Sequence, residues 1–267
     1  MTDEERVPGW LQALEKRHLA DLTAAETARA LRALSSCYVE RRAKLASGGA
    51  LDSAGKRAAF ALFYAPLHFL VTREVVRALA RREHVPNTSD ASHASGAARD
   101  ILQVTTILDL GCGTGAAGAA WALEADRCTV RGIDRHPWVV AEANWSYGVL
   151  GVSGRAASGD IDRVPLKAGP GDAILAAYTV NELPQPTRDG LLPRLLEAHQ
   201  RGARVLVVEP IARKMMGWWN RWETAVTAAG GTCDEWRFAI ALPERQRQLG
   251  RAAGLDPREL TARSFWL

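Results

Sequence analysis

Apolar residues recur at three- and four-residue steps through two stretches near the start of the chain. The first covers residues 9–47 and the second residues 54–82. Such spacing places the apolar side chains on one face of a helix. Residues 83–100 are small and polar, a composition typical of a connecting loop. We therefore expect an N-terminal helical region and linker over residues 1–100.

After this linker the pattern changes to short apolar runs that alternate with longer helical segments. Runs of strand type cover residues 104–110, 128–134, 172–178 and 203–209, and a weaker one precedes Gly159. Apolar strands separated by helices indicate a parallel sheet that is buried on both faces. Two more strand-like runs, at 233–242 and 259–267, flank a short helix rich in Arg and Gln. The pattern predicts an α/β domain over residues 101–267.

The first of these strands runs directly into a glycine-rich turn, ILDLGCGTGAAG, and then into an alanine-rich helix. Because Gly111, Gly113 and Gly115 lack a Cβ atom, they can adopt positive φ and let a ligand approach the backbone at the carboxyl end of the strand. Cys112 is then expected beside the ligand as a small side chain. The segment indicates a nucleotide-cofactor site.

Two cofactors compete for this turn. Gly113 to Gly118 spell the dinucleotide pattern G-x-G-x-x-G, and Asp134 follows at the distance expected of a ribose-binding acid, which would suit NAD. Asp109, however, stands just ahead of the turn, where it would oppose a pyrophosphate and favour the positive charges of S-adenosylmethionine (SAM). At an effective dielectric constant of about 20, a unit charge about 4 Å away is worth about 4 kcal/mol. The sequence therefore favours SAM.

Further acids follow the second and third strands. Asp134, with Arg135 beside it, ends the run GID, where a carboxylate can accept both ribose hydroxyls; it could instead cap the next helix. Asp160 and Ile161 follow the weak third strand, where an acid could bind the adenine amino group and an apolar side chain could flank the ring. The alternative for Asp160 is a simple turn acid.

With the turn DLGCGTG, the run GID and a fourth strand leading into AAYTVNELP, the chain resembles the class I SAM-dependent methyltransferases. AAYTVNELP, VLVVEP, LSSCYVERRAKL and YAPLHFLVTREVVRAL further resemble the ribosomal small-subunit assembly methyltransferase-like family of mitochondria and bacteria. The resemblance covers most of residues 34–225. It implies a Rossmann-like, mostly parallel seven-stranded sheet with an antiparallel C-terminal strand, SAM as cofactor, and ribosomal RNA or a ribosome-associated target as acceptor.

In this superfamily the donor methyl group points at the loop after the fourth strand, here residues 178–184. The resemblance therefore places Tyr178 beside the cofactor and makes Asn181 and Glu182 candidates to hold or deprotonate an acceptor. Their alternative is a helix start stabilised by a carboxylate. NELP is not the Asn/Asp-Pro-Pro-aromatic loop of base N-methyltransferases, and we expect no DNA partner. A non-catalytic SAM-binding assembly factor and a small-molecule methyltransferase stay open.

Members of the narrower family often carry a group of cysteines after the fifth strand, and here that region contains only Cys233. An iron–sulfur cluster needs about four thiolates, so we expect no metal. The absence of a CxxC pair and the acidic N-terminus suggest a reduced, cytoplasmic protein. The longest uncharged apolar run, 58–72, has 15 residues, whereas a span needs about 20, so no membrane span is expected.

Composition and charge add one weak indication of partners. With 47% hydrophobic and 24% charged residues, the chain is expected to fold around a sizeable core. Its net charge is +4, with basic flanks around a mildly acidic middle. Arg73, Arg77 and Arg81, with Arg82 beside them, share a helix face that could follow phosphates or simply face water. The cluster Trp218/Trp219/Trp222 could stack on bases or pack into the core.

Overall fold

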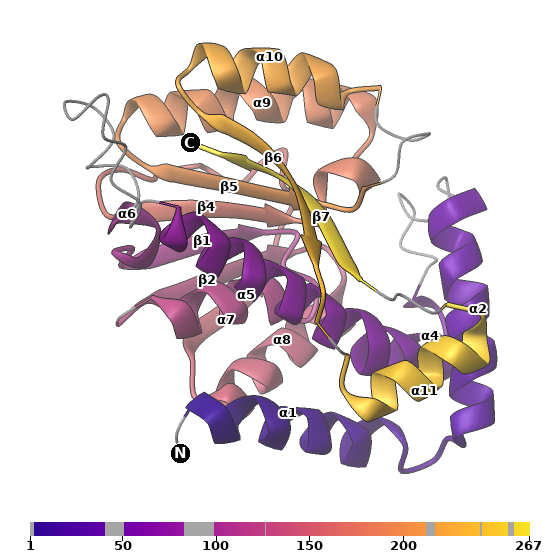
Figure 1. Cartoon of the computed structure of the whole chain (residues 1–267). Coiled ribbons are helices and arrows are strands. Elements are labelled where there is room, and N and C mark those ends of the chain that lie inside the picture. Colours follow the sequence, from indigo (N-terminus) through magenta and orange to yellow (C-terminus); the bar gives the residue numbers. More distant parts are fainter. Residues whose placement is uncertain are drawn as a thin grey trace.

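A computed structural model describes residues 3–40, 51–82, 99–125, 127–211, 217–240, 242–255 and 259–267. Its centre is a seven-stranded sheet in the order β3-β2-β1-β4-β5-β7-β6 (Figure 1). The strands are β1 (Thr106–Leu110), β2 (Thr129–Asp134), β3 (Ser153–Ser158), β4 (Asp172–Ala177), β5 (Arg204–Glu209), β6 (Thr232–Phe238) and β7 (Leu260–Trp266). All seven fall on or beside the runs that predicted them.

Strand directions in the sheet follow the expected scheme. β1 lies between β2 and β4 and is parallel to both, so that Asp109 pairs with Gly132 on one side and Leu175 on the other. β7 runs antiparallel to both β5 and β6. The prediction of a mostly parallel seven-stranded sheet with an antiparallel C-terminal strand is therefore confirmed. The carboxyl ends of β1, β2 and β4 meet at one edge, where parallel sheets of this type bind ligands.

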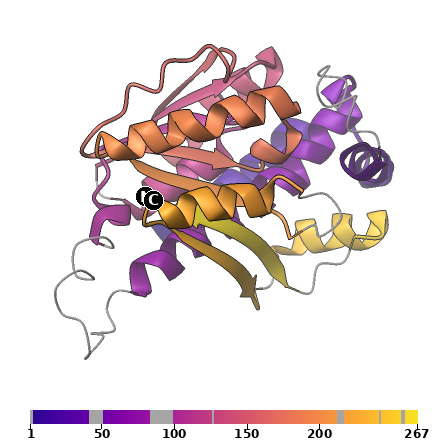
Figure 2. The same cartoon turned by 90° about the horizontal axis from the view of Figure 1, so that it is seen from above.

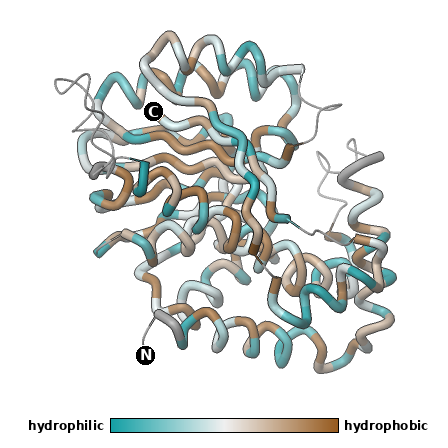
Figure 3. Tube along the Cα trace, in the orientation of Figure 1, coloured by the Kyte–Doolittle hydropathy of each residue, from teal (hydrophilic) through white to brown (hydrophobic). Residues whose placement is uncertain are grey.

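Helices cover both faces of the sheet (Figures 1 and 2). One face is covered by α5, α7 and α8, and the other by α9 and α10. The helices are α1 (Asp3–His18), α2 (Ala24–Glu40), α4 (Ala54–Ala59), α5 (Ala65–Arg81), α6 (Arg99–Leu102), α7 (Ala116–Glu124), α8 (Pro137–Leu150), α9 (Gln185–Gln200), α10 (Trp219–Ala228) and α11 (Glu244–Ala253). Because both faces are buried, the central strands are hydrophobic along their length (Figure 3).

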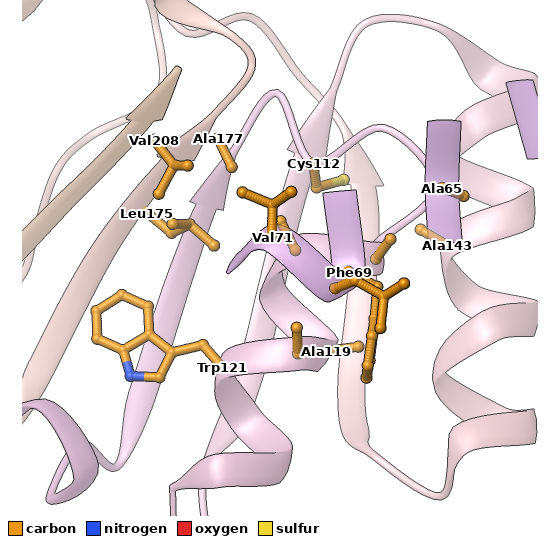
Figure 4. Packing of buried hydrophobic residues seen from close by; sticks show 14 of the residues in the cluster. Ala65, Phe69, Val71, Cys112, Ala119, Trp121, Ala143, Leu175, Ala177 and Val208 are labelled. Atoms are coloured by element: carbon orange, nitrogen blue, oxygen red, sulfur yellow. The ribbon is translucent and has the colours of Figure 1, made fainter. Parts of the chain in front are cut away.

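The N-terminal helices share a hydrophobic core with the sheet. Trp10 of α1 and Leu34 of α2 belong to the same buried cluster as Leu175 of β4. Figure 4 shows Val71 of α5 beside Leu175, with the indole of Trp121 close by. α6 begins at Arg99, so the predicted linker ends slightly earlier than residue 100. The proposed boundary at residue 100 therefore separates two parts of one packed unit.

A long helix is continuous from Ala54 to Arg81, but its winding changes within it. Residues Phe60–Tyr64 form a short π-helix, η2, between α4 and α5. Pro66 has no N–H to donate to the carbonyl of Leu62, four residues earlier. Gln246 of α11 replaces it, because its buried Nε2 donates to that carbonyl at 2.8 Å. A π-helical turn inside an α-helix is frequent at functional sites.

By length and composition, helix Ala54–Arg81 is the one helix in the described ranges that could cross a membrane. However, 72% of its most apolar window is buried within the protein. Its length and apolar character are thus used in packing against α7 and the sheet.

The arginine face of α5 is largely engaged within the protein. Arg77 Nη2 lies 2.8 Å from the carboxylate of Glu124 on α7, and Arg82 Nη1 lies 2.5 Å from Asp234 on β6. Arg73 lies over the ring of Phe69 at 5.4 Å. Arg73 and Arg77 thus take part in packing, whereas Arg81 and Arg82 are exposed, so phosphate binding by this face stays a prediction. Arg41, Arg42 and Lys44, upstream on the same basic flank, lie outside the described residues.

The tryptophan cluster is part of the core beneath α10. Trp218, Trp219 and Trp222 expose 4%, 4% and 1% of their surfaces. The Trp219 ring stacks on Phe265 of β7 with centroids 3.8 Å apart. Buried rings cannot stack on bases without unfolding the helix, so the core interpretation is confirmed.

Candidate functional site: a cofactor cavity at the carboxyl edge of the sheet

The glycine turn after β1 has the backbone conformation that the sequence predicts. Gly111, Gly113 and Gly115 have φ values of +65°, +51° and +76°. The N–H groups of Gly111 and Cys112 donate to the carbonyl of Ile133 at 2.8 and 3.0 Å, which joins the turn to the end of β2. A Cβ atom on Gly111 would lie 2.5 Å from Thr179 Cγ2. The turn therefore requires glycine here both for its φ and for its closeness to the loop after β4.

Asp109 lies at the floor of the cavity that opens above this turn. It exposes 1% of its surface, and its Oδ2 accepts the N–H of Gly118 on α7 at 3.2 Å. Burial raises the pKa of Asp109 from its ordinary value of 3.8 to about 7, the Gly118 hydrogen bond opposes this shift, and the Asp134 carboxylate adds to it. A cation bound above Asp109 would favour its ionised form.

Asp134 connects the end of β2 to the glycine turn. Its Oδ2 accepts the N–H of Gly113 at 3.0 Å and its Oδ1 accepts the N–H of His136 at 2.9 Å. The N-cap of α8 is His136, whose Nδ1 accepts the N–H of Trp138. Asp134 is therefore not the cap itself, and it and Arg135 both line the cavity. Each carboxylate oxygen keeps a lone pair that a hydroxyl donor can use.

The residues after β3 form another part of the wall. Asp160 accepts the N–H of Asp162 through Oδ1 at 3.1 Å, which is the turn geometry that the alternative interpretation expected. Asp160 and the buried Ile161 nevertheless line the same cavity. The structure thus gives Asp160 a turn bond and a place at the site together.

The cavity between these loops has a volume of about 620 Å³, within the range of about 300–1,000 Å³ that is usual for ligand sites. Most of the residues that the sequence singled out line it: Asp109, Gly111, Cys112, Gly113, Asp134, Arg135, Asp160, Ile161, Tyr178 and Glu182. Gly115 does not; it starts α7, and a Cβ atom there would lie 2.7 Å from the ring of Tyr147.

Asn181 is the other predicted residue that lies outside the cavity lining. It belongs to the short 3₁₀ helix η3 (Val180–Glu182), and its N–H donates to Glu209 Oε1 at 3.1 Å. Asn181 exposes 8% of its surface and is not among the residues that line the cavity. Its assignment as an acceptor-binding residue gains no support from the cavity lining and stays a prediction, whereas Glu182 is exposed and lines the cavity.

Cys112 lines the cavity as a small side chain, as the sequence predicted. Burial, and next the Asp109 and Asp134 carboxylates, raise the pKa of its thiol well above the ordinary value of 9.0. A thiol held protonated is a poor nucleophile. Among the described residues, no group of three His, Cys, Asp or Glu side chains could hold a metal ion.

Phe60, Tyr64 and His68 form an aromatic wall with the predicted Tyr178, and these three partners were missed from the sequence. His68 stacks on Tyr178 with ring centroids 3.8 Å apart and planes at 9°. Phe60 packs edge-on to His68 at 6.1 Å, and Tyr64 lies 5.9 Å from both Phe60 and His68. Phe60, His68 and Tyr178 line the cavity. The four-residue spacing of positions 60, 64 and 68 was a signal, but it does not show that this helix face turns toward the glycine turn.

Tyr178 is held toward this wall by an unusual backbone conformation. Its φ is +57°, which is uncommon for a residue with a side chain, and its N–H donates to Val208 of β5 at 2.7 Å. Backbone strain of this kind collects at ligand sites. The strand β4 thus ends by turning an aromatic ring into the cavity.

These residues fit SAM. Asp109 presents a buried acid to the positively charged end of the cofactor, Asp134 presents carboxylate oxygens to ribose hydroxyls, and Asp160 with Ile161 can hold the adenine. The glycines leave the space between them open, because a Cβ atom on Gly113 would meet no atom closer than 3.7 Å. Fold and site together define a class I SAM-dependent methyltransferase domain.

Comparisons with known proteins agree with this class. Residues 107–202 match the family model described as a methyltransferase domain. The fold is similar to mitomycin 7-O-methyltransferase MmcR, at 13% identity over 87% of this chain and 59% of that chain, with a TM-score of 0.50. Magnesium protoporphyrin IX methyltransferase from Synechocystis PCC 6803 with bound SAM matches at 12% identity, over 74% of this chain and 79% of that chain, with a TM-score of 0.45.

A SAM-dependent methyltransferase from Aquifex aeolicus matches at 17% identity, over 63% of this chain and 84% of that chain, with a TM-score of 0.41. No curated protein is similar enough in sequence to match. Residues 107–202 therefore form a methyltransferase domain, and SAM is the cofactor of such a domain. The narrower resemblance to the ribosomal small-subunit assembly family is not supported by these findings and stays a prediction.

Proposed function

We propose that this methyltransferase transfers the methyl group of SAM to a small organic molecule. The observation that carries the proposal is the place of Phe60 and His68. These side chains come from the helix Ala54–Arg81 of the N-terminal region, yet they line the same cavity as Asp109 and Tyr178. The cofactor cavity is therefore walled on its acceptor side by the protein's own helix, which suits an acceptor small enough to enter a pocket.

The features that suggested a ribosomal RNA acceptor are partly used within the protein, although the Arg77 and Arg82 side chains stay 40% and 50% exposed. Arg77 and Arg82 bind carboxylates on α7 and β6, and Trp219 is stacked in the core. A protein that holds RNA is expected to keep cationic side chains accessible to phosphates. RNA is accordingly the alternative outcome of the test below.

When bound, SAM supplies a methyl group on a positively charged sulfur; transfer breaks the S–C bond, forms a bond to the acceptor nucleophile and leaves S-adenosylhomocysteine. The chain's residues act by binding and orientation, which alone can supply much of the rate enhancement. Asp109 and Asp134 would hold the cofactor, and the aromatic wall would orient the acceptor. Glu182, at the rim, can take the proton that the nucleophile loses.

The test is transfer of tritium from methyl-labelled SAM into a fractionated extract of the host cell. We expect label in the low-molecular-mass fraction with wild-type protein, and its loss with Asp109→Asn. Arg127→Gln, in the turn before β2 and outside the cavity lining, is a matched control that should label as wild type. Label that appears only in RNA or only in protein would refute the small-molecule proposal while leaving the methyltransferase assignment intact.

A further inference from the structure

The aromatic wall and the acid at its edge select a chemical class of acceptor. We infer that the acceptor is a flat aromatic molecule that carries a basic nitrogen, bound against Phe60, His68 and Tyr178 with its nitrogen toward Glu182. This inference rests on the proposed function, since it concerns the same cavity. It adds the charge and the shape of the acceptor, neither of which follows from SAM dependence.

Flatness follows from the ring arrangement. His68 and Tyr178 form a stacked pair whose planes differ by 9°, and Phe60 stands at 82° to His68. The two rings cover one face of each other and both line the cavity, so a planar guest would stack on an outer face of the pair and meet Phe60 edge-on. Both geometries are favourable between aromatic groups, at about 0.5–1.5 kcal/mol per pair beyond simple burial.

The charge follows from the ionisable groups around the wall. Burial lowers the pKa of His68 from 6.5 to about 3, so its ring is neutral near pH 7. Burial raises the pKa of Tyr64, and the nearby Glu182 carboxylate raises it further, so Tyr64 is neutral as well. Neutral aromatic faces beside a carboxylate attract an ammonium group.

Among the described residues that line the cavity, acidic side chains outnumber basic ones. Among the described residues of the lining, Arg135 is the one Lys or Arg, and it follows β2, beside the ribose-binding acid. Acids outnumber it there: Asp109, Asp134, Asp160, Asp162 and Glu182 all line the cavity. An acceptor carboxylate or phosphate would meet repulsion, whereas a basic nitrogen would be attracted.

The experiment compares three molecules that share one ring system and differ in charge: tryptamine, tryptophol and indole-3-acetate. Each is titrated calorimetrically into protein saturated with S-adenosylhomocysteine, so that binding is measured without turnover. We expect tryptamine to bind about tenfold more tightly than indole-3-acetate, with tryptophol between them, from cation–π attraction and one partly exposed ion pair.

Two variants and one control assign the effect to Glu182 and to the aromatic wall. Glu182→Gln should bring the affinities of tryptamine and tryptophol within about threefold of each other, because it removes the charge and keeps the size. Phe60→Leu should weaken the binding of all three molecules by the same factor. Glu197→Gln, an exposed acid on α9 outside the cavity lining, should leave the order unchanged.

The inference is overturned if indole-3-acetate binds as tightly as tryptamine, if Glu182→Gln keeps the preference, or if none of the three binds while S-adenosylhomocysteine does. These results are distinct from a failure of the proposed function, which would show as label transferred only to RNA or protein. A protein that binds S-adenosylhomocysteine and labels small molecules without preferring amines would refute the inference alone.

Discussion

Replacing Asp109 with asparagine removes one negative charge from the cavity floor and keeps an oxygen that can accept the Gly118 N–H. In the free protein the pKa of Asp109 is about 7. If only the ionised carboxylate attracts the cofactor's cationic end, cofactor affinity of the wild type rises about tenfold between pH 6 and pH 8, or about 1.4 kcal/mol. The Asp109→Asn affinity should lack this component.

The same substitution has the opposite effect on the stability of the free protein. The folded-state pKa lies above the ordinary value of 3.8, so ionisation of Asp109 penalises the folded state. Stability is unaffected below about pH 4 and decreases as the pH rises toward 7. At pH 8 the penalty is about 4 kcal/mol, which Asp109→Asn should largely recover. The buried acid thus lowers the stability of the free protein at the place where a cation binds.

The assay is calorimetric titration with S-adenosylhomocysteine at pH 6, 7 and 8 for both proteins, with urea unfolding at pH 4 and pH 8. Titration of the ligand's own groups affects the wild type and Asp109→Asn equally. The ratio of their two affinities therefore reports the contribution of the Asp109 charge alone. Equal pH dependence in both proteins, or a variant that is no more stable than the wild type at pH 8, would show that the buried charge of Asp109 does not act as argued.

Three other predictions follow from local geometry. Gly111→Ala should abolish cofactor binding, because the new Cβ atom would be strained at φ +65° and would lie 2.5 Å from Thr179. The control Gly148→Ala, which has open space around it in α8, should bind the cofactor normally and gain about 0.5–1 kcal/mol of stability. Calorimetry measures the binding of both variants, and urea unfolding measures their stability. Trp219→Ala should lower the unfolding free energy by about 3–5 kcal/mol by emptying a core site, and a loss of RNA binding at unchanged stability would contradict its buried role. Arg77→Gln should lower stability without changing cofactor affinity, and a weakened affinity measured by calorimetry would refute its assignment to packing.

Much of the sheet could be predicted because its strands are buried on both faces. The run ARVLVVE has no polar position that faces solvent along most of its length, and β5 is indeed buried from Val205 to Glu209. The connection between the N-terminal helices and the sheet was less predictable. Periodicity shows which helix face is apolar, but it does not show that Trp10 and Leu175 enter the same core.

The site was predictable where backbone geometry demands particular residues. Gly111 and Gly113 need positive φ, and Asp109 and Asp134 follow directly from their places at strand ends. The aromatic wall was not, because His68 and Tyr178 are 110 positions apart and meet only through packing. Asn181 lies outside the cavity lining for a related reason: a sequence shows that a residue belongs to a loop, but not how deeply the fold buries it.

The central claim is that the loops around Asp109, Gly111 and Asp134 form a site for SAM and not for a pyrophosphate-containing cofactor. Calorimetric titration of the purified wild-type protein with SAM and with NAD tests it directly. We expect saturable one-to-one binding of SAM and no heat of binding for NAD at millimolar concentration. Binding of NAD, or no uptake of SAM at that concentration, would contradict it.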